Sequence, residues 1–193
     1  MSLQNSLSDM FQGMRFFIPE ILILVWVLVF TGFEIFLGNA EKKLQSNLRF
    51  FIAYLGLIFG IIFGFQRGEM NYFGPVGHNL FFLNSEYYTY SILVLGMGLI
   101  LIFVNHLVKK IISFEEIISF WAIILGALYT GASSHWLILL LGIETMTLGT
   151  YGLVAYKKSK LSYRAALPYL FFGLTITAIF IYGISLFMAF LEV

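Results

Sequence analysis

The sequence predicts an all-α integral membrane protein with six transmembrane helices, and three observations support this prediction. Of the 193 residues, 60% are hydrophobic and only 11% are charged, with a mean hydropathy of +0.93. This composition lies outside the usual range of water-soluble domains. The apolar residues gather in segments of about 20 residues, the length that a helix needs to cross a bilayer core of roughly 30 Å. The basic residues fall in every second connection between these segments. We therefore expect a single transmembrane domain over residues 1–193.

The six predicted spans follow one another with short breaks. They cover residues 17–37, 49–66, 87–108, 114–131, 135–156 and 163–190. Near the start of the first span, Pro19 has no N–H to leave unpaired, and the carboxylate of Glu20 complements the positive end of the helix dipole. Residues 1–15 are polar and are followed by an apolar segment too long for a signal peptide, so we expect this span to be retained.

Glycines and carboxylates near the other spans predict packing and interfacial contacts. The second span carries three glycines at four-residue spacing, Gly56, Gly60 and Gly64. This spacing predicts close packing against a neighbouring helix, whereas glycines scattered in a Gly-rich membrane helix are the alternative. Glu34 is expected either to reach the membrane interface or to meet Lys42 or Lys43 of the loop that follows it. Glu115 and Glu116 are expected in a solvated or interfacial ion-pair cluster with Lys109 and Lys110, which precede them.

The charge distribution predicts the direction of the spans. Nine of the eleven Lys and Arg residues lie in or beside the connections after spans one, three and five: Lys42, Lys43, Arg49, Lys109, Lys110, Lys157, Lys158, Lys160 and Arg164. The positive-inside rule places these three connections on the cytoplasmic or matrix side and both termini on the opposite side. An odd number of spans would put basic connections on both sides, so the alternation also supports the count of six.

Glu144 is the only acidic or basic side chain well inside the apolar run from Trp136 to Tyr156. It lies roughly 12 Å along a helix from Trp136 and roughly 18 Å from Tyr156, near the middle of the membrane. A carboxylate at this depth is costly or takes up a proton, which predicts a role in proton or ion handling. Thr147 and Tyr151 share its helix face and are candidates for hydrogen bonds to it or for a polar path. A protonated or internally bonded glutamate that only joins helices is the alternative.

Several classes of site are not expected on this chain. It has no cysteine, which excludes disulfides, iron–sulfur ligation and thiolate metal sites. His78, His106 and His135 lie in loops or at helix ends, whereas axial haem ligands would lie deep in facing spans. The sequence shows no Gly-rich phosphate loop, metal-ligand cluster or nucleophile with a nearby base. We expect no metal site, no cofactor-binding site and no nucleic-acid partner.

The segment from His135 onward resembles the antiporter-like subunits of respiratory complex I, most closely the subunit 2 family of NADH:quinone oxidoreductase. The resemblance rests on GIETMTLGTYGLVAYKK in the fifth span, the basic loop after it, and YRAALPYLFFGLTITAIFIYG in the sixth. Members of the family have a buried Glu in this helix, then a basic loop, then a helix with YG near its end. IPEILIL and FFLNSEYYTYSILVLGMG resemble the family's first and third helices.

The resemblance implies the first half of an antiporter-like helix bundle in the membrane arm of respiratory complex I (NADH:ubiquinone oxidoreductase). Glu144 would be one member of a buried Glu and Lys pair that takes part in proton translocation coupled to electron transfer. No cofactor is then expected on this chain, because FMN, the iron–sulfur clusters and ubiquinone belong to the complex as a whole. The implied partners are other membrane-arm subunits and lipids. The implied location is the mitochondrial inner membrane, with both termini on the intermembrane-space side; the bacterial plasma membrane or the thylakoid is the alternative.

Two departures from the family pattern limit what the resemblance implies. Pro168 stands where the family has a lysine, which predicts a local bend in the sixth span, and Arg164 one turn earlier is a candidate for charge near the same place. Family members also have about twice as many helices, one of which bears the partner lysine. Because the chain begins with Met, we expect a split gene rather than a fragment, with a second polypeptide supplying helices seven onward. The alternatives are a related cation/proton antiporter or membrane hydrogenase subunit, and a structural membrane subunit that has lost pumping.

Overall fold

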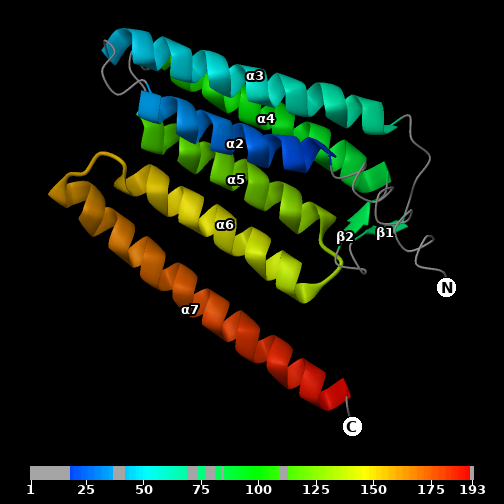
Figure 1. The fold of residues 1–193 in the computed structure, drawn as a ribbon. Coiled ribbons are helices and arrows are strands. Elements are labelled where there is room, and N and C mark those ends of the chain that lie inside the picture. Colours follow the sequence, from blue (N-terminus) through cyan, green and yellow to red (C-terminus); the bar gives the residue numbers. More distant parts are fainter. Residues whose placement is uncertain are drawn as a thin grey trace.

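The computed structural model describes residues 18–36, 42–68, 74–76, 81–83, 85–108 and 113–191. Within them the chain forms six helices: α2 (Ile18–Phe36), α3 (Lys42–Gly68), α4 (Ser85–Val108), α5 (Phe114–Ala132), α6 (Trp136–Ala155) and α7 (Lys160–Leu191). Figure 1 shows them running alongside one another as a bundle. The predicted all-α membrane fold is confirmed, since α3 to α7 each contain a segment long and apolar enough to cross a membrane. α2 is a further helix of 19 mainly apolar residues.

The helices begin and end close to the predicted spans, with one clear difference. α3 begins at Lys42, whereas the apolar pattern places the start of the second span at residue 49. The polar residues at the start of α3 are not counted in a search for apolar segments. They nevertheless continue the helix beyond the apolar part of the membrane. α7 also begins slightly earlier than predicted, at Lys160.

The connection between α3 and α4 contains a short β-hairpin that the apolar pattern does not indicate. β1 (Gly74–Val76) pairs antiparallel with β2 (Phe81–Leu83), with Val76 opposite Phe81. Phe81 also forms a β-bridge with Ser133, which follows the end of α5. The hairpin therefore attaches this connection to the end of the bundle where α5 ends and α6 begins.

The hydrophobic core lies among α2, α3, α4 and α5. α5 is central, because it packs against the other three and against α6. Among the described residues, the core cluster comes from these four helices: Ile23, Phe30, Phe50, Ala53, Leu57, Leu95, Ile102, Ile117, Trp121, Ile124, Leu125 and Leu128. α7 lies on the far side of α6 (Figure 1) and, apart from the buried Ala166, leaves most of its length exposed. The bundle is thus one-sided, with a packed core at one flank and an open α6–α7 flank.

Glycines allow α5 and α6 to approach each other closely. A Cβ atom on Gly142 would lie 2.6 Å from Thr130 Cγ2 and 2.9 Å from the carbonyl oxygen of Gly126. A Cβ atom on Gly149 would lie 2.8 Å from the carbonyl oxygen of Ser119. Side chains larger than hydrogen would push the two backbones apart, so these glycines set the distance between the helices. We call the set the α5–α6 glycine contact: Gly126, Gly142, Gly149 and Gly152.

The predicted glycine face of α3 has one tight position. A Cβ atom on Gly56 would lie 2.3 Å from Cδ1 of Trp26, which reaches over from α2. The nearest atom to a Cβ would lie at 3.4 Å for Gly60 and at 3.9 Å for Gly64, which is close to ordinary contact. The predicted close packing is therefore found at Gly56, where the neighbour is an indole ring.

Candidate functional site

Glu144 lies on α6, which the α5–α6 glycine contact holds against the core. It is roughly 12 Å along the helix from Trp136, so it is near the middle of this 20-residue helix. Gly142 and Gly149 are buried on the side that faces α5, whereas the half-buried Glu144 side chain faces α7. The same helix therefore uses small residues to pack on the core and presents its carboxylate to the open flank.

The Glu144 carboxylate accepts a hydrogen bond from Thr177 on α7, between Thr177 Oγ1 and Glu144 Oε1. The same hydroxyl oxygen lies 3.0 Å from the backbone carbonyl oxygen of Gly173, one turn earlier in α7. A threonine hydroxyl has one hydrogen, so it donates to one of these two acceptors at a time. The sequence gives little sign of this partner, because the pairing depends on how α6 and α7 cross; the available signal is a threonine inside an apolar span.

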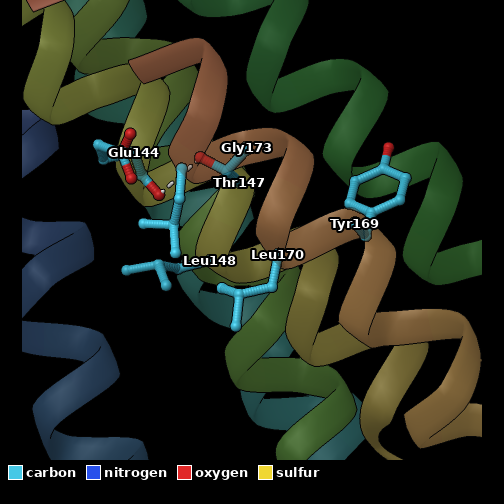
Figure 2. Close-up of a pocket in the computed structure, with 7 residues that line it drawn as sticks. Glu144, Thr147, Leu148, Tyr169, Leu170 and Gly173 are labelled. Atoms are coloured by element: carbon cyan, nitrogen blue, oxygen red, sulfur yellow. Dashed lines mark hydrogen bonds between the residues drawn. The ribbon is translucent and has the colours of Figure 1, made fainter. Parts of the chain in front are cut away.

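A small pocket lies beside Glu144 between α6 and α7 (Figure 2). Its lining residues come from both helices: Glu144, Thr147, Leu148, Tyr169, Leu170, Gly173 and Leu174. The centre of a water molecule can occupy a volume of about 30 Å³ within this pocket. This volume is enough for one or two water molecules. Figure 2 shows the Tyr169 hydroxyl pointing away from the Glu144 carboxylate. The pocket can therefore hold water next to the carboxylate. Apart from Glu144, few of the side chains that line the pocket are polar.

The two predicted polar-path residues, Thr147 and Tyr151, make no hydrogen bond to the Glu144 carboxylate among the described residues. Thr147 Oγ1 donates within its own helix, at 2.7 Å from the carbonyl oxygen of Ile143 and 3.1 Å from that of Glu144. Thr147 nevertheless lines the pocket. Tyr151 is half-buried and makes no hydrogen bond to Glu144 within the described part of the chain. The hydrogen bond to the carboxylate comes from Thr177 on α7 instead, and the polar path through Thr147 and Tyr151 stays a prediction.

Arg164 and Pro168 lie on the exposed surface near the start of α7. α7 is continuous through Pro168, and the local bend expected there stays a prediction. Within the described ranges, the ion pairs are Glu34 with Arg49 and Glu115 with Lys158. The structure therefore provides no cation paired with Glu144 among the residues it describes.

Two other carboxylates form ion pairs that differ from the expected ones. Glu34 on α2 pairs with Arg49 on α3, where the guanidinium Nε and Nη2 donate to the two carboxylate oxygens. Its partner is thus an arginine well inside the next helix and not a loop lysine. Glu115 accepts a hydrogen bond from Lys158 at 2.7 Å, in the turn between α6 and α7. The hydrogen bond and the charge of Glu115 raise the pKa of Lys158 above its ordinary value.

Two further carboxylates are buried near the ends of the bundle. Glu20 is 1% exposed and accepts a hydrogen bond from the hydroxyl of Tyr87, so it does more than complement the dipole of α2. Glu116 is 3% exposed and accepts from Asn105 Nδ2 at 3.2 Å, so its side chain is buried and not solvated. Lys109 and Lys110, the cations expected in a cluster with it, lie outside the described residues.

The histidines that the structure describes have local roles. The His106 ring stacks on Phe50 with centroids 4.2 Å apart, and His135 caps α6 by accepting from the backbone N–H of Leu137 at 3.2 Å. His78 lies outside the described residues. Among those described, no group of three or more His, Asp or Glu could hold a metal ion. Without cysteine, the chain does not fit an iron–sulfur cluster.

Comparison with known proteins identifies two relatives that align along most of this chain and a third that aligns along a shorter segment. It is 28% identical over 171 residues to the NADH-quinone oxidoreductase subunit N of Protochlamydia amoebophila, covering 87% of this chain and 35% of that protein. It is 27% identical over 175 residues to the NAD(P)H-quinone oxidoreductase subunit 2 of Trichodesmium erythraeum, and the match covers 89% of this chain and 32% of that protein. A shorter match, 36% identical over 63 residues, is to the NAD(P)H-quinone oxidoreductase subunit 2 of Trichormus variabilis and covers 32% and 12%.

These similarities support the subunit 2 family at modest sequence identity. No family model matches the chain. The chain spans about a third of the length of the curated relatives that it matches along most of its own length.

Proposed function

We propose that this chain is a membrane-arm subunit of a complex I-type NADH:quinone oxidoreductase and that Glu144 binds and releases a proton during translocation. The names of the relatives aligned along most of the chain support the first part. The second part rests on one observation, a carboxylate in the middle of a membrane-spanning helix that opens onto a water-sized pocket. Ionisable groups at such depth commonly mark proton or ion pathways.

The proposed chemistry is a change in the charge that neighbours Glu144. A carboxylate is costly in an apolar layer, so loss of a nearby cation favours proton uptake and its return favours proton release. The Thr177 hydroxyl and the adjoining pocket supply a hydrogen-bond donor and access for water. Thr147 and Tyr151 extend the polar surface of α6 beyond the carboxylate in this proposal.

The cation and the missing helices are proposed to come from a second polypeptide. The chain spans about a third of the length of its relatives, and its α6–α7 flank is the side with few buried residues. A lysine on the second polypeptide would approach Glu144 from this flank. Arg164 lies near the start of α7 and would add charge at the basic end of the same flank.

The remaining assignments follow from the same proposal. The chain contributes no redox centre, and FMN, the iron–sulfur clusters and ubiquinone belong to other parts of the complex. Its partners are the other membrane-arm subunits and lipids. The membrane is the mitochondrial inner membrane, with the bacterial plasma membrane or the thylakoid as alternatives, and the turn at Lys158 lies on the matrix or cytoplasmic side.

The proposed role of Glu144 is tested by Glu144→Gln in the intact complex. We expect the rate of proton translocation coupled to NADH oxidation to fall about tenfold or more, because proton-transfer groups contribute factors of at least this size. The measurements, in proteoliposomes, are the rate of proton translocation and the ratio of protons translocated to NADH oxidised. Glu86→Gln, which changes an exposed carboxylate in the first turn of α4, is the matched control.

Two results would contradict the proposal. An unchanged ratio and rate in Glu144→Gln would leave a structural subunit as the function. Purification of this chain without a flavin-containing NADH-oxidising partner would favour a related cation/proton antiporter or membrane hydrogenase.

A further inference from the structure

We infer that the Thr177 hydroxyl is a two-position hydrogen-bond switch that follows the protonation of Glu144 and transmits it to the backbone of α7. The inference rests on the proposed proton-binding role of Glu144. It is carried by the position of one hydroxyl between two acceptors on different helices, Oε1 of Glu144 on α6 and the carbonyl oxygen of Gly173 on α7.

With Glu144 ionised, the Thr177 O–H donates to the carboxylate. An ionised acceptor forms a stronger hydrogen bond than a neutral carbonyl, so it takes the single hydroxyl hydrogen. The carbonyl of Gly173 then keeps its ordinary helical partner, the backbone N–H of Thr177. In this state the hydrogen bond joins α6 to α7.

With Glu144 protonated on Oε1, the direction of the hydrogen bond reverses. The carboxyl O–H donates to a lone pair of Thr177 Oγ1, and the Thr177 O–H rotates to the Gly173 carbonyl oxygen, which already lies within reach at 3.0 Å. One proton is added to Glu144, and no other atom is gained or lost. The Glu144 Oε1 and Thr177 hydroxyl groups are hydrogen-bonded to each other in both states.

The second position of the switch acts on α7 itself. A threonine hydroxyl that donates to the carbonyl four residues earlier weakens the local helix and often bends it. Gly173 lines the pocket and packs against α6, since a Cβ atom placed on it would lie 3.4 Å from Thr147 Cγ2. Proton binding at Glu144 is thereby linked to the packing of α7 on α6 at the pocket.

A neighbouring threonine provides the matched control. Thr175 Oγ1 donates to the carbonyl oxygen of Phe171 at 2.8 Å, and its side chain is exposed on α7. Its hydroxyl makes the same kind of bond within the helix as Thr177 does to Gly173, but it does not reach Glu144 in this structure. Thr175→Val therefore removes an equivalent bond without altering the switch.

Infrared difference spectra of the full chain in lipid bilayers, recorded between acidic and alkaline pH, test the inference. The C=O band of protonated Glu144 is the band that Glu144→Gln removes. We expect Thr177→Val to shift this band to higher frequency, because the carboxyl O–H loses its acceptor. Thr177→Ser, which keeps the hydroxyl, and Thr175→Val should leave the band at its original frequency.

Two outcomes would overturn the inference, and they have different consequences for the proposed function. A band at the same frequency in Thr177→Val would remove the switch but leave Glu144 as a proton-binding group. A spectrum in which Glu144→Gln removes no carboxyl band would remove both the switch and the proton-binding role.

Discussion

The ion pair of Glu34 and Arg49 is mostly buried and has bidentate geometry. The Arg49 and Glu34 side chains are 12% and 18% exposed, and two guanidinium nitrogens face two carboxylate oxygens. Bidentate geometry of this kind adds both strength and a defined orientation. The pair therefore fixes α2 against α3 in a way that a flexible surface pair does not.

Removing one charge of this pair should destabilise the protein. Glu34→Gln removes the bidentate ion pair with Arg49 where both side chains are mostly buried, and we expect it to lower the free energy of unfolding by about 3 kcal/mol. Denaturation in mixed micelles, followed by circular dichroism, measures the change.

Two variants serve as controls for this prediction. The double variant Glu34→Leu, Arg49→Leu should recover most of the loss, because neither charge remains. Glu115→Gln, which removes the exposed partner of Lys158, should have a small effect. Equal destabilisation by Glu34→Gln and Glu115→Gln would contradict the distinction between the two pairs.

At the scale of single helices, the α5–α6 glycine contact positions the candidate site. Gly142 lies two residues before Glu144 and is packed against the backbone of α5. The neighbouring atoms include main-chain atoms of Thr130 and Gly126, which cannot rotate away as a side chain can. The position of α6, and with it the position of Glu144 relative to α7, depends on the absence of a side chain here.

Gly142→Ala should therefore be destabilising although alanine favours helices. We expect the free energy of unfolding to fall by about 1–3 kcal/mol, the usual range for overpacking. Gly183→Ala on α7 is the control, because a Cβ atom there would have nothing within 4 Å. The same denaturation measurement applies, and an equal effect of the two substitutions would show that the contact does not set the helix spacing.

The helices could be predicted from the sequence better than their contacts could. Apolar length places each helix, and the isolation of Glu144 in an apolar run marks it as a candidate. The regular spacing of Gly56, Gly60 and Gly64 is visible within one helix. Of these three positions, only Gly56 lies too close to a neighbouring helix to accept a side chain. The contact between Gly126 and Gly142 and the pairing of Glu144 with Thr177 each need two helices, and their relative rotation is not encoded in either segment alone.

At the scale of the whole molecule, the core is unevenly shared among the helices. α2 to α5 supply the core residues, and Ala166 is the buried apolar residue that α7 contributes. Packing inside a membrane relies on such close contacts, since lipid tails are as apolar as the side chains. The stability of the bundle should therefore depend little on α7.

Truncation of the chain after Tyr156 tests this uneven distribution. We expect α2 to α6 to keep their helical content and a cooperative thermal transition close to that of the full chain. Phe30→Ala in the full chain should by contrast lower the free energy of unfolding by about 3–5 kcal/mol, because Phe30 is 1% exposed in the core. Circular dichroism in lipid nanodiscs compares the two, and loss of the transition on truncation would contradict the prediction.

The open flank also sets the order in which the site forms during synthesis. Domains and helices that emerge first from the ribosome fold first, and the helices that share the core all precede α7 in the chain. α6 can pack on that completed core while α7 is still being translated. Glu144 then enters the bilayer before Thr177 exists as a partner, so a newborn chain lacks the hydrogen bond between this carboxyl group and α7 until its last helix is inserted.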